Sequence, residues 1–446
     1  MRYLSNVFLL LLLAGGLCAQ EVEEKSKKET DWGKVEGLIR LYHVFEPAYI
    51  KTGRAKDYDI DGSTIGGHIR YHTPELSGLG ATTAVYYARG TGLNDKNDPD
   101  TIMAAGRFFT KDYSPKAVWG ELNLHYQDDT NHAIVGRYKF DSPLTNAIYT
   151  YMPNMFQAAQ YENGSLGSTK ITIAQIEKMA YGSRAPVEFG LIGEVTRTGG
   201  TTQNALDIRG DFIDIEKQTL ADPDAKTNGV TALGVVNNSV QDTRLRFWDF
   251  YAHDIMNMFY FDALFKPKEA PYSLEAQYLR NDSVGDDLAS KWMDSSSAYL
   301  LGVKATYKYQ KAFFYIGYNH TGNSKILNPW SGDPAYTSSF FSKNAYRANV
   351  DAYKLGFNYD ILKNLKLITS HADYGQSTTL GKFAPTDTGA LGLPQADAFE
   401  SAVLLSYKPL KGLHILGGVI YKTSEYYDQG EQVKLLDLDL LVTYKF

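Results

Sequence analysis

Hydrophobic and polar residues alternate along the last thirteen residues of the chain, which read KLLDLDLLVTYKF. One set of alternate positions, from Leu436 to Phe446, is wholly apolar, whereas the other set contains Asp437 and Asp439. Successive side chains of a β-strand point to opposite faces, so this stretch is predicted to be a strand with one apolar and one mostly polar face. A half-buried strand of a soluble sheet shows the same pattern, and that alternative stays open for this stretch alone.

The alternation recurs along the chain and predicts eighteen strands. They lie at residues 35–45, 63–73, 79–89, 117–127, 131–140, 155–162, 169–178, 229–238, 244–253, 257–265, 272–281, 298–309, 312–321, 347–359, 365–374, 397–407, 413–422 and 434–446. Short turns alternate with longer polar connections, among them 90–116, 179–228, 282–297, 322–346, 375–396 and 423–433. An even number of strands with short turns at one rim and long loops at the other is typical of bacterial outer-membrane barrels.

Two segments fit this scheme poorly. Residues 254–257 form a short connection where a long loop is expected, and residues 187–195 have the composition of a further strand. We assign residues 187–195 to a structured external loop.

Charged residues within the predicted strands favour a transmembrane antiparallel β-barrel with a wet interior. A dry core does not tolerate many unpaired charges, whereas a barrel of sixteen to eighteen strands encloses water. A sheet in hydrocarbon must also close on itself, because open edges leave backbone groups without partners. The strand 434–446 is therefore predicted to pair with 35–45. The charged residues predicted to face inward are Arg40, His68, Arg70, Glu121, His125, Arg137, Lys139, Lys304, Lys308, Lys354, Asp437 and Asp439.

The first nineteen residues have the pattern of a secretory signal peptide. Arg2 precedes an apolar run at residues 7–13, which is too short to span a membrane, and cleavage is predicted after Ala19. Cys18 is the only cysteine, and Leu17 before it disfavours a lipoprotein signal, so the mature chain is predicted to lack disulfides. Residues 20–34 are highly charged and are predicted to be a periplasmic lead-in to a barrel formed by residues 35–446.

Composition narrows the function. The formal net charge is −6 without a basic patch, which argues against a nucleic-acid partner. Aromatic residues make up 13% of the chain, with 33 Tyr, as expected for many strands with interfacial side chains. The nine histidines show no metal-binding spacing, and no metal or other cofactor is predicted.

Two other classes of function compete with a channel. An outer-membrane lipase or protease would need a catalytic His, for which His253-Asp254 and His371-Asp373 are the candidates; the chain has no G-x-S-x-G motif, so we predict no enzyme. The remaining alternative is a secreted, non-enzymatic binding or adhesion protein with a β-sandwich fold.

Four segments and the C-terminus resemble one family. The segments are residues 66–80 (GGHIRYHTPELSGLG), 136–146 with 152–156, 246–254 (RFWDFYAHD) and 322–338, and they resemble the OprD-type outer-membrane porins. The resemblance implies an eighteen-stranded barrel in the bacterial outer membrane, monomeric or homotrimeric, which admits ions, amino acids, peptides, carboxylates or other small hydrophilic solutes. Phe446 resembles the signal that the barrel-assembly machinery reads.

The resemblance also implies a constriction. In such porins the third external loop folds into the lumen, and here that loop is about residues 141–156, stiffened by Pro143 and Pro153. A surface loop with two prolines is the plainer alternative. The residues expected to line the pore or its constriction are Arg40, Arg70 and Arg137 on a basic side, Asp141 and Asp249 on an acidic side, and His68, Lys139 and Tyr149. Whether they select ions or only line the lumen, and which solute passes, stays open.

Overall fold

The computed structural model describes residues 32–46, 60–92, 115–183, 209–215, 226–293, 295–330, 332–340, 347–377, 397–428 and 431–446. The chain divides into two units, Met1–Gly33 and Lys34–Phe446, and the fold below is that of the second. The predicted signal peptide, nearly all of the charged lead-in and the segment 187–195 lie outside the described residues.

Strands make up nearly all of the regular structure in the described part of the chain. In order they are β1 (Lys34–Glu46), β2 (Ile60–His72), β3 (Leu79–Gly90), β4 (Lys116–Gln127), β5 (Asn131–Tyr138), β6 (Met155–Leu166), β7 (Thr169–Ala180), β8 (Ile213–Asp214), β9 (Val230–Asn237) and β10 (Thr243–Ala252). They continue with β11 (Met256–Phe265), β12 (Tyr272–Ser283), β13 (Ser297–Tyr309), β14 (Ala312–Thr321), β15 (Asp351–Leu362), β16 (Leu365–Tyr374), β17 (Ala398–Tyr407), β18 (Leu413–Asp428) and β19 (Glu431–Lys445). A short helix, α6 (Ser290–Met293), lies between β12 and β13.

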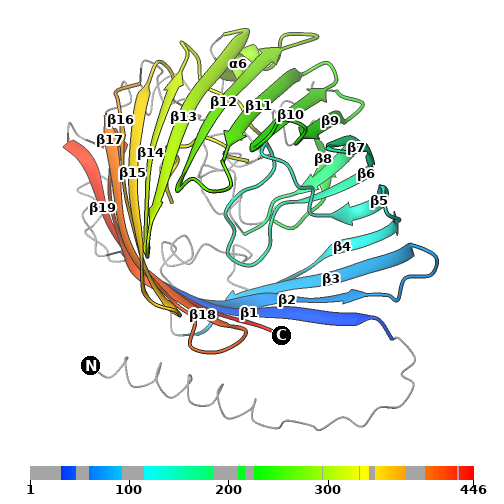
Figure 1. The fold of residues 1–446 in the computed structure, drawn as a ribbon, viewed down its shortest axis with the longest axis horizontal. Coiled ribbons are helices and arrows are strands. Elements are labelled where there is room, and N and C mark those ends of the chain that lie inside the picture. Colours follow the sequence, from blue (N-terminus) through cyan, green and yellow to red (C-terminus); the bar gives the residue numbers. More distant parts are fainter. Residues whose placement is uncertain are drawn as a thin grey trace. The chain divides into compact units, whose positions relative to one another are not determined.

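The strands form one closed antiparallel sheet (Figure 1). From β1 to β7 and from β9 to β19 each strand pairs with the next, and β7 pairs with β9. The first and last strands also pair, with Leu41 opposite Val442. Within the described residues β8 contributes only a two-residue pairing to β7, so the other eighteen strands close the barrel.

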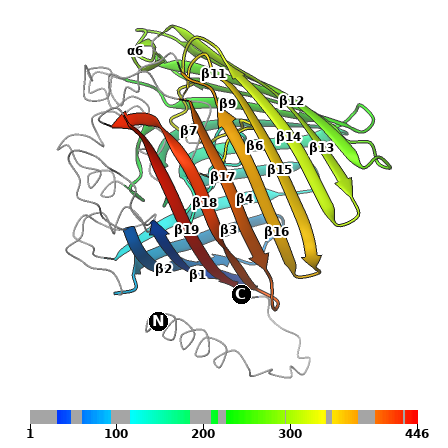
Figure 2. The same cartoon turned by 90° about the vertical axis from the view of Figure 1, so that its left-hand side faces the viewer.

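The pairing of β1 with β19, which we call the seam, extends to the last residue. The backbone amide of Gly37 donates to the carbonyl oxygen of Phe446 at 3.0 Å, and the amide of Phe446 donates to the carbonyl of Gly37 at 3.1 Å. The prediction that strand 434–446 pairs with strand 35–45 is confirmed. Figure 2 shows β19 beside β1 from a second direction.

All eighteen predicted barrel strands are present, and two connections differ from expectation. The prediction of a long loop at residues 423–433 is wrong, because β18 continues to Asp428 and β19 begins at Glu431. The connection between β10 and β11 is short, as its sequence indicated. The backbone amide of Val284 donates a hydrogen bond to the carbonyl of Ile255 in this hairpin at 3.1 Å, and Ile255 is fully buried.

The two faces of the barrel wall differ in polarity. Large apolar side chains are exposed on the outer face, for example Ile69 and Leu124, which are 61% and 64% exposed. The inner face carries charges, including Asp437 and Asp439 on the side of β19 opposite its apolar residues. None of the helices in the described part of the chain is long and apolar enough to cross a membrane.

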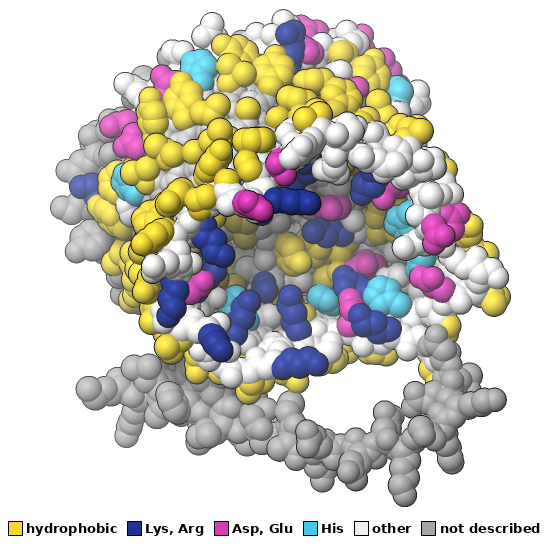
Figure 3. Space-filling view, viewed as in Figure 1, with side chains coloured by type: hydrophobic (Ala, Val, Ile, Leu, Met, Phe, Trp, Pro, Cys, Tyr) yellow, Lys and Arg dark blue, Asp and Glu magenta, His cyan; other side chains and the backbone are white. Residues whose placement is uncertain are grey.

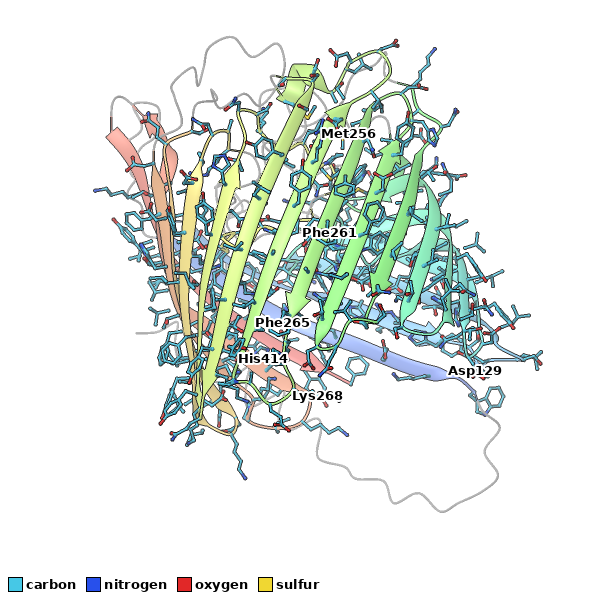
Figure 4. All side chains as sticks on the ribbon, turned by 45° about the horizontal axis from the view of Figure 1, so that its top comes forward. Asp129, Met256, Phe261, Phe265, Lys268 and His414 are labelled. Carbon is cyan, nitrogen blue, oxygen red and sulfur yellow. The ribbon has the colours of Figure 1, made fainter. Side chains whose placement is uncertain are left out.

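Short turns gather at one end of the barrel. In Figure 4, Asp129 and Lys268, each in such a turn, lie at the opposite end of the strands from Met256. The carboxylate of Asp128 caps one turn by accepting hydrogen bonds from the amides of Thr130 and Asn131, both at 2.8 Å. These bonds to the charged form hold the pKa of Asp128 below its usual value.

Gly67 provides a test of the close approach between β1 and β2. Its φ is +151°, and a Cβ at this position would overlap the carbonyl oxygen of Leu38. We expect Gly67→Ala to destabilise the barrel by roughly 1–3 kcal/mol, through backbone strain and separation of the two strands. The measurement is the temperature at which the compact form, which migrates faster on an unheated gel, is lost.

The matched control is Gly90→Ala, because a Cβ on Gly90 meets no atom within 4 Å. Equal melting temperatures for the two variants would contradict the proposed contact.

Candidate functional site

The connection between β5 and β6, residues 139–154, which we call the third loop, reaches strands that are not its neighbours. Arg40 of β1 donates through Nη1 to the carbonyl oxygens of Tyr149, at 3.4 Å, and Thr150. The Tyr151 hydroxyl bonds Thr64 of β2, and its ring lies where a Cβ on Gly66 would be. Gly66 thus allows the third loop to dock against the inner face of β2.

The end of the third loop is also held from β7. The Ser183 hydroxyl, just beyond β7, accepts hydrogen bonds from the amides of Thr150 and Tyr151, both at 3.0 Å. Ser183 also donates to the carbonyl of Met152 at 3.1 Å. Because Tyr151 and Met152 are fully buried, this part of the loop is packed against the wall and is not a free surface loop.

A second segment, the connection between β14 and β15 (residues 322–350, which we call the seventh loop), contacts the third loop. Asn328 donates to the carbonyl of Leu144 at 3.0 Å, and the amide of Gly332 donates to the same carbonyl at 3.0 Å. Asn154 donates to the carbonyl of Trp330 at 3.3 Å. These hydrogen bonds join the described parts of the two loops.

The two loops pack against the inner wall through a large apolar cluster. Phe140 makes edge-to-face contacts with Phe156, Trp248 and Phe250, with ring centroids 5.8–6.1 Å apart. Tyr181 links the wall to the seventh loop, because its buried hydroxyl donates to the carbonyl of Pro329 at 2.9 Å. Burial raises the pKa of this phenol. The members from the loops include Phe140, Leu144, Ile326, Leu327 and Trp330, and those from the wall include Phe156, Ile176, Trp248, Phe250, Met258 and Tyr260.

The inner wall between β1 and β4 carries a charge network around Arg70. Its guanidinium pairs with Glu36 at 2.8 Å and with Glu121 at 2.5 Å. Tyr86 donates a further hydrogen bond to Glu121 at 2.5 Å. Two carboxylates therefore surround Arg70, and its positive charge is compensated locally.

A second network on β10 and β11 has the opposite balance. Asp262 accepts two hydrogen bonds from Arg246 Nε, at 3.1 and 2.9 Å, and lies 3.5 Å from Arg244 Nη2. One buried carboxylate thus serves two guanidinium groups. Close to this network in the sheet, Lys304 pairs with Glu275 at 2.9 Å and lies 5.5 Å from the ring centre of Tyr336 of the seventh loop.

Figure 3 shows a hollow in the face of the barrel with lysine and arginine side chains around it and fewer acidic ones. A basic opening lined by side chains attracts anions more than the net charge suggests.

The structure brings only some of the predicted site residues together. Arg40, His68 and Arg70 lie on the inner face, and His68 packs 4.9 Å from the Tyr86 ring centre. Asp141 and Tyr149 lie in the third loop, where Asp141 accepts a hydrogen bond from Asn146 at 2.5 Å. Asp141 is exposed, and Tyr149 is 37% exposed.

Arg137, Lys139 and Asp249 differ from the predicted inward orientation. Arg137 lies opposite Leu122, which is 53% exposed on the outer face, and its guanidinium stacks 4.2 Å from the Phe212 ring centre. Asp249 lies opposite Leu233, which is also on the outer face. Lys139 is exposed just beyond the end of β5. The same cause applies to β5 and β10. Loops cover the inner faces of both strands, so apolar side chains occupy the inward positions and the charged side chains point the other way.

Four charged residues of the two networks were not predicted from sequence, namely Glu36, Arg244, Arg246 and Asp262. Arg244 and Arg246 alternate with apolar residues and share their face with Trp248 and Phe250. Because this face of β10 is charged at one end and aromatic at the other, the alternation of polar and apolar residues does not identify it as a polar face. The only indication in the sequence was the spacing of the two arginines, Arg244-x-Arg246.

The histidines considered as catalytic candidates have hydroxyl partners on an adjacent strand. His371 Nδ1 lies 2.8 Å from Ser401 Oγ on the outer face, and His253 Nε2 lies 2.9 Å from Thr231 Oγ1. His72 and His414 make similar bonds, so such pairs recur as structural contacts across strands. Among the described residues no group of His, Cys, Asp and Glu has the arrangement of a metal site.

Comparison with known proteins gives a consistent fold. No family model matches the sequence, and no curated protein matches it. The chain is similar in structure to OccK9 (OpdG) from Pseudomonas aeruginosa, with a TM-score of 0.70 and 13% identity over 92% of this chain and 97% of that one. It is also similar to a BenF-like porin from Pseudomonas fluorescens, with a TM-score of 0.68 and 10% identity over 93% of this chain and 98% of that one. OccK2 (OpdF) from P. aeruginosa, in complex with glucuronate, has a TM-score of 0.67 and 10% identity over 93% of this chain and 98% of that one. The fold is thus that of the OprD and Occ porins.

Asp262 is the residue of the second network whose substitution should lower stability most, because both arginines pair with it. Its side chain is 2% exposed, so Asp262→Asn would leave two guanidinium groups without their shared carboxylate. We expect a loss of roughly 1–3 kcal/mol in stability, measured as the temperature at which the compact gel form is lost.

Asp282→Asn is the matched control, because Asp282 pairs with Arg280, which is 50% exposed on the outer face. We expect less than about 0.5 kcal/mol for this exposed pair. A larger effect at Asp282 than at Asp262 would argue against the assigned network.

Proposed function

We propose that this protein is an outer-membrane porin that forms a water-filled channel for the passive diffusion of small hydrophilic solutes. The observation that carries the proposal is the closed eighteen-strand barrel with an apolar outer face and a charged inner face. Closure satisfies the backbone groups in hydrocarbon, and a barrel of this size leaves room for water. The β-sandwich alternative is not favoured, because its two packed sheets would not close into one ring.

The third and seventh loops form the constriction in this proposal. The contacts of Tyr149 and Tyr151 with β1 and β2 support it, because the loop begins and ends three to five strands away along the sheet. A segment that joins two distant parts of a barrel wall from the inside crosses the lumen. The plainer possibility, a surface loop with two prolines, does not account for the full burial of Tyr151.

We further propose that small anions, including carboxylates, pass more readily than cations. The support is the pair Arg244 and Arg246, which share a single carboxylate, together with the basic side chains around the hollow in Figure 3. Arg70 contributes little to this preference, because Glu36 and Glu121 compensate its charge. Fixed charges along a narrow pore set its ion preference.

The partners follow from the same proposal. Outer-membrane lipid would contact the apolar outer face, and the barrel-assembly machinery would read the C-terminal strand ending in Phe446. A homotrimer stays an expectation from the resemblance. The signal peptide at residues 1–19 and the lead-in at 20–34 stay predictions from the residue pattern.

Ion preference can be tested in planar lipid bilayers. The protein should give single-channel steps, and the reversal potential in a KCl gradient should show preference for chloride. Lys304→Gln should reduce the chloride-to-potassium permeability ratio roughly two- to threefold, because a unit charge about 7 Å from an ion in water contributes about 0.6 kcal/mol.

Arg280→Gln is the matched control, and we expect no change in the permeability ratio because Arg280 is 50% exposed on the outer face. Absence of steps in the unsubstituted protein would refute the channel. Steps with a shift at Arg280 and none at Lys304 would refute the assignment of the lumen. Swelling of liposomes in amino acids, sugars and carboxylates would then identify the solute class.

A further inference from the structure

We infer that Arg40 is a positioning residue, which sets the width of the channel by holding the tip of the third loop against the seam. The inference rests on the proposed channel function. Sequence alternation placed Arg40 among residues that would attract ions, and the geometry gives it a different role. Its contacts in the described structure are hydrogen bonds to neutral acceptors, without an ion pair.

Arg40 bridges three parts of the chain at once. Its Nε donates to Thr443 Oγ1 of β19 at 2.8 Å, which aligns the guanidinium across the seam. Its Nη1 points to the loop and donates to the carbonyls of Tyr149 and Thr150. A planar guanidinium has donors fixed in a fork, so it can serve β19 and the loop together. A lysine has the same charge and lacks this geometry.

The rest of the third loop has other attachments. Residues 150–152 are held by Ser183, and Leu144 is held by Asn328 and Gly332. Between these attachments lie Ile148 and Tyr149, which we call the tip and which are 52% and 37% exposed. Arg40 donates a hydrogen bond from the wall to the carbonyl of Tyr149 at 3.4 Å. Arg40 is therefore placed to control the tip without controlling the fold of the whole loop.

Loss of the tether should free the tip. Hydrogen bonds to a charged donor are worth enough that their loss increases the population of a released tip roughly ten- to a hundredfold. The loop spans the lumen to reach β1, so a released tip moves back towards its stems and widens the pore. The expected result is a higher mean single-channel conductance with flicker between two levels.

The test separates geometry from charge. Arg40→Lys keeps the charge and removes the fork, and Thr443→Val removes the acceptor that aligns Arg40 without changing any charge. Both variants should raise the conductance and add flicker while the chloride-to-potassium permeability ratio stays as in the unsubstituted protein. Arg280→Lys, on the outer face of β12, is the matched control and should change neither quantity. The faster gel mobility of unheated samples confirms that each variant is folded.

A second measurement does not depend on conduction. A spin label at Ile148→Cys reports the mobility of the tip directly, because Cys18 is the only native cysteine and lies in the predicted signal peptide. Arg40→Lys and Thr443→Val should both increase this mobility. If Arg40→Lys leaves conductance, flicker and label mobility unchanged while Arg40→Met shifts only the permeability ratio, Arg40 selects ions and the inference is wrong. If the unsubstituted protein does not conduct, the channel proposal fails, and the spin label alone decides whether Arg40 holds the tip.

Discussion

Closure of the sheet is the constraint on which the rest of the structure depends. Each backbone group of a strand in an apolar medium needs a partner, and the pairing of β1 with β19 supplies the last set of partners. With the ring closed, alternation gives every strand an outer and an inner face. The apolar outer face, the charged inner face and the enclosed space are consequences of this single geometric condition.

The enclosed space is not uniformly polar. The third and seventh loops bring Phe140, Leu144 and Trp330 against Trp248 and Phe250, so part of the inner wall is packed like the core of a soluble protein. Charges concentrate at other places on the inner wall, as at Arg70 and Asp262. The enclosed space is therefore apolar in one part and charged in another.

Much of this architecture could be predicted from sequence. Period-two alternation located all eighteen strands and the pairing of the ends, because it depends only on which face meets which medium. The orientation of Arg137 and Asp249 could not be predicted in the same way. Their strands are covered from inside by loops distant in sequence, and alternation does not reveal whether an inward position meets water or a packed loop. The charged pair Arg244 and Arg246 was missed for the same reason, since its face also carries Trp248 and Phe250.

The bond between Arg40 and Thr443 joins residues 403 positions apart, whereas nearly all other strand pairs in the barrel are hairpins between consecutive strands. Contacts between consecutive strands can form while the chain is still open, but a contact across the seam requires that both ends have met. The alignment of Arg40, and with it the fixed position of the loop tip, is thus among the last events of assembly. A barrel that has not closed has its strands and loops but no defined aperture.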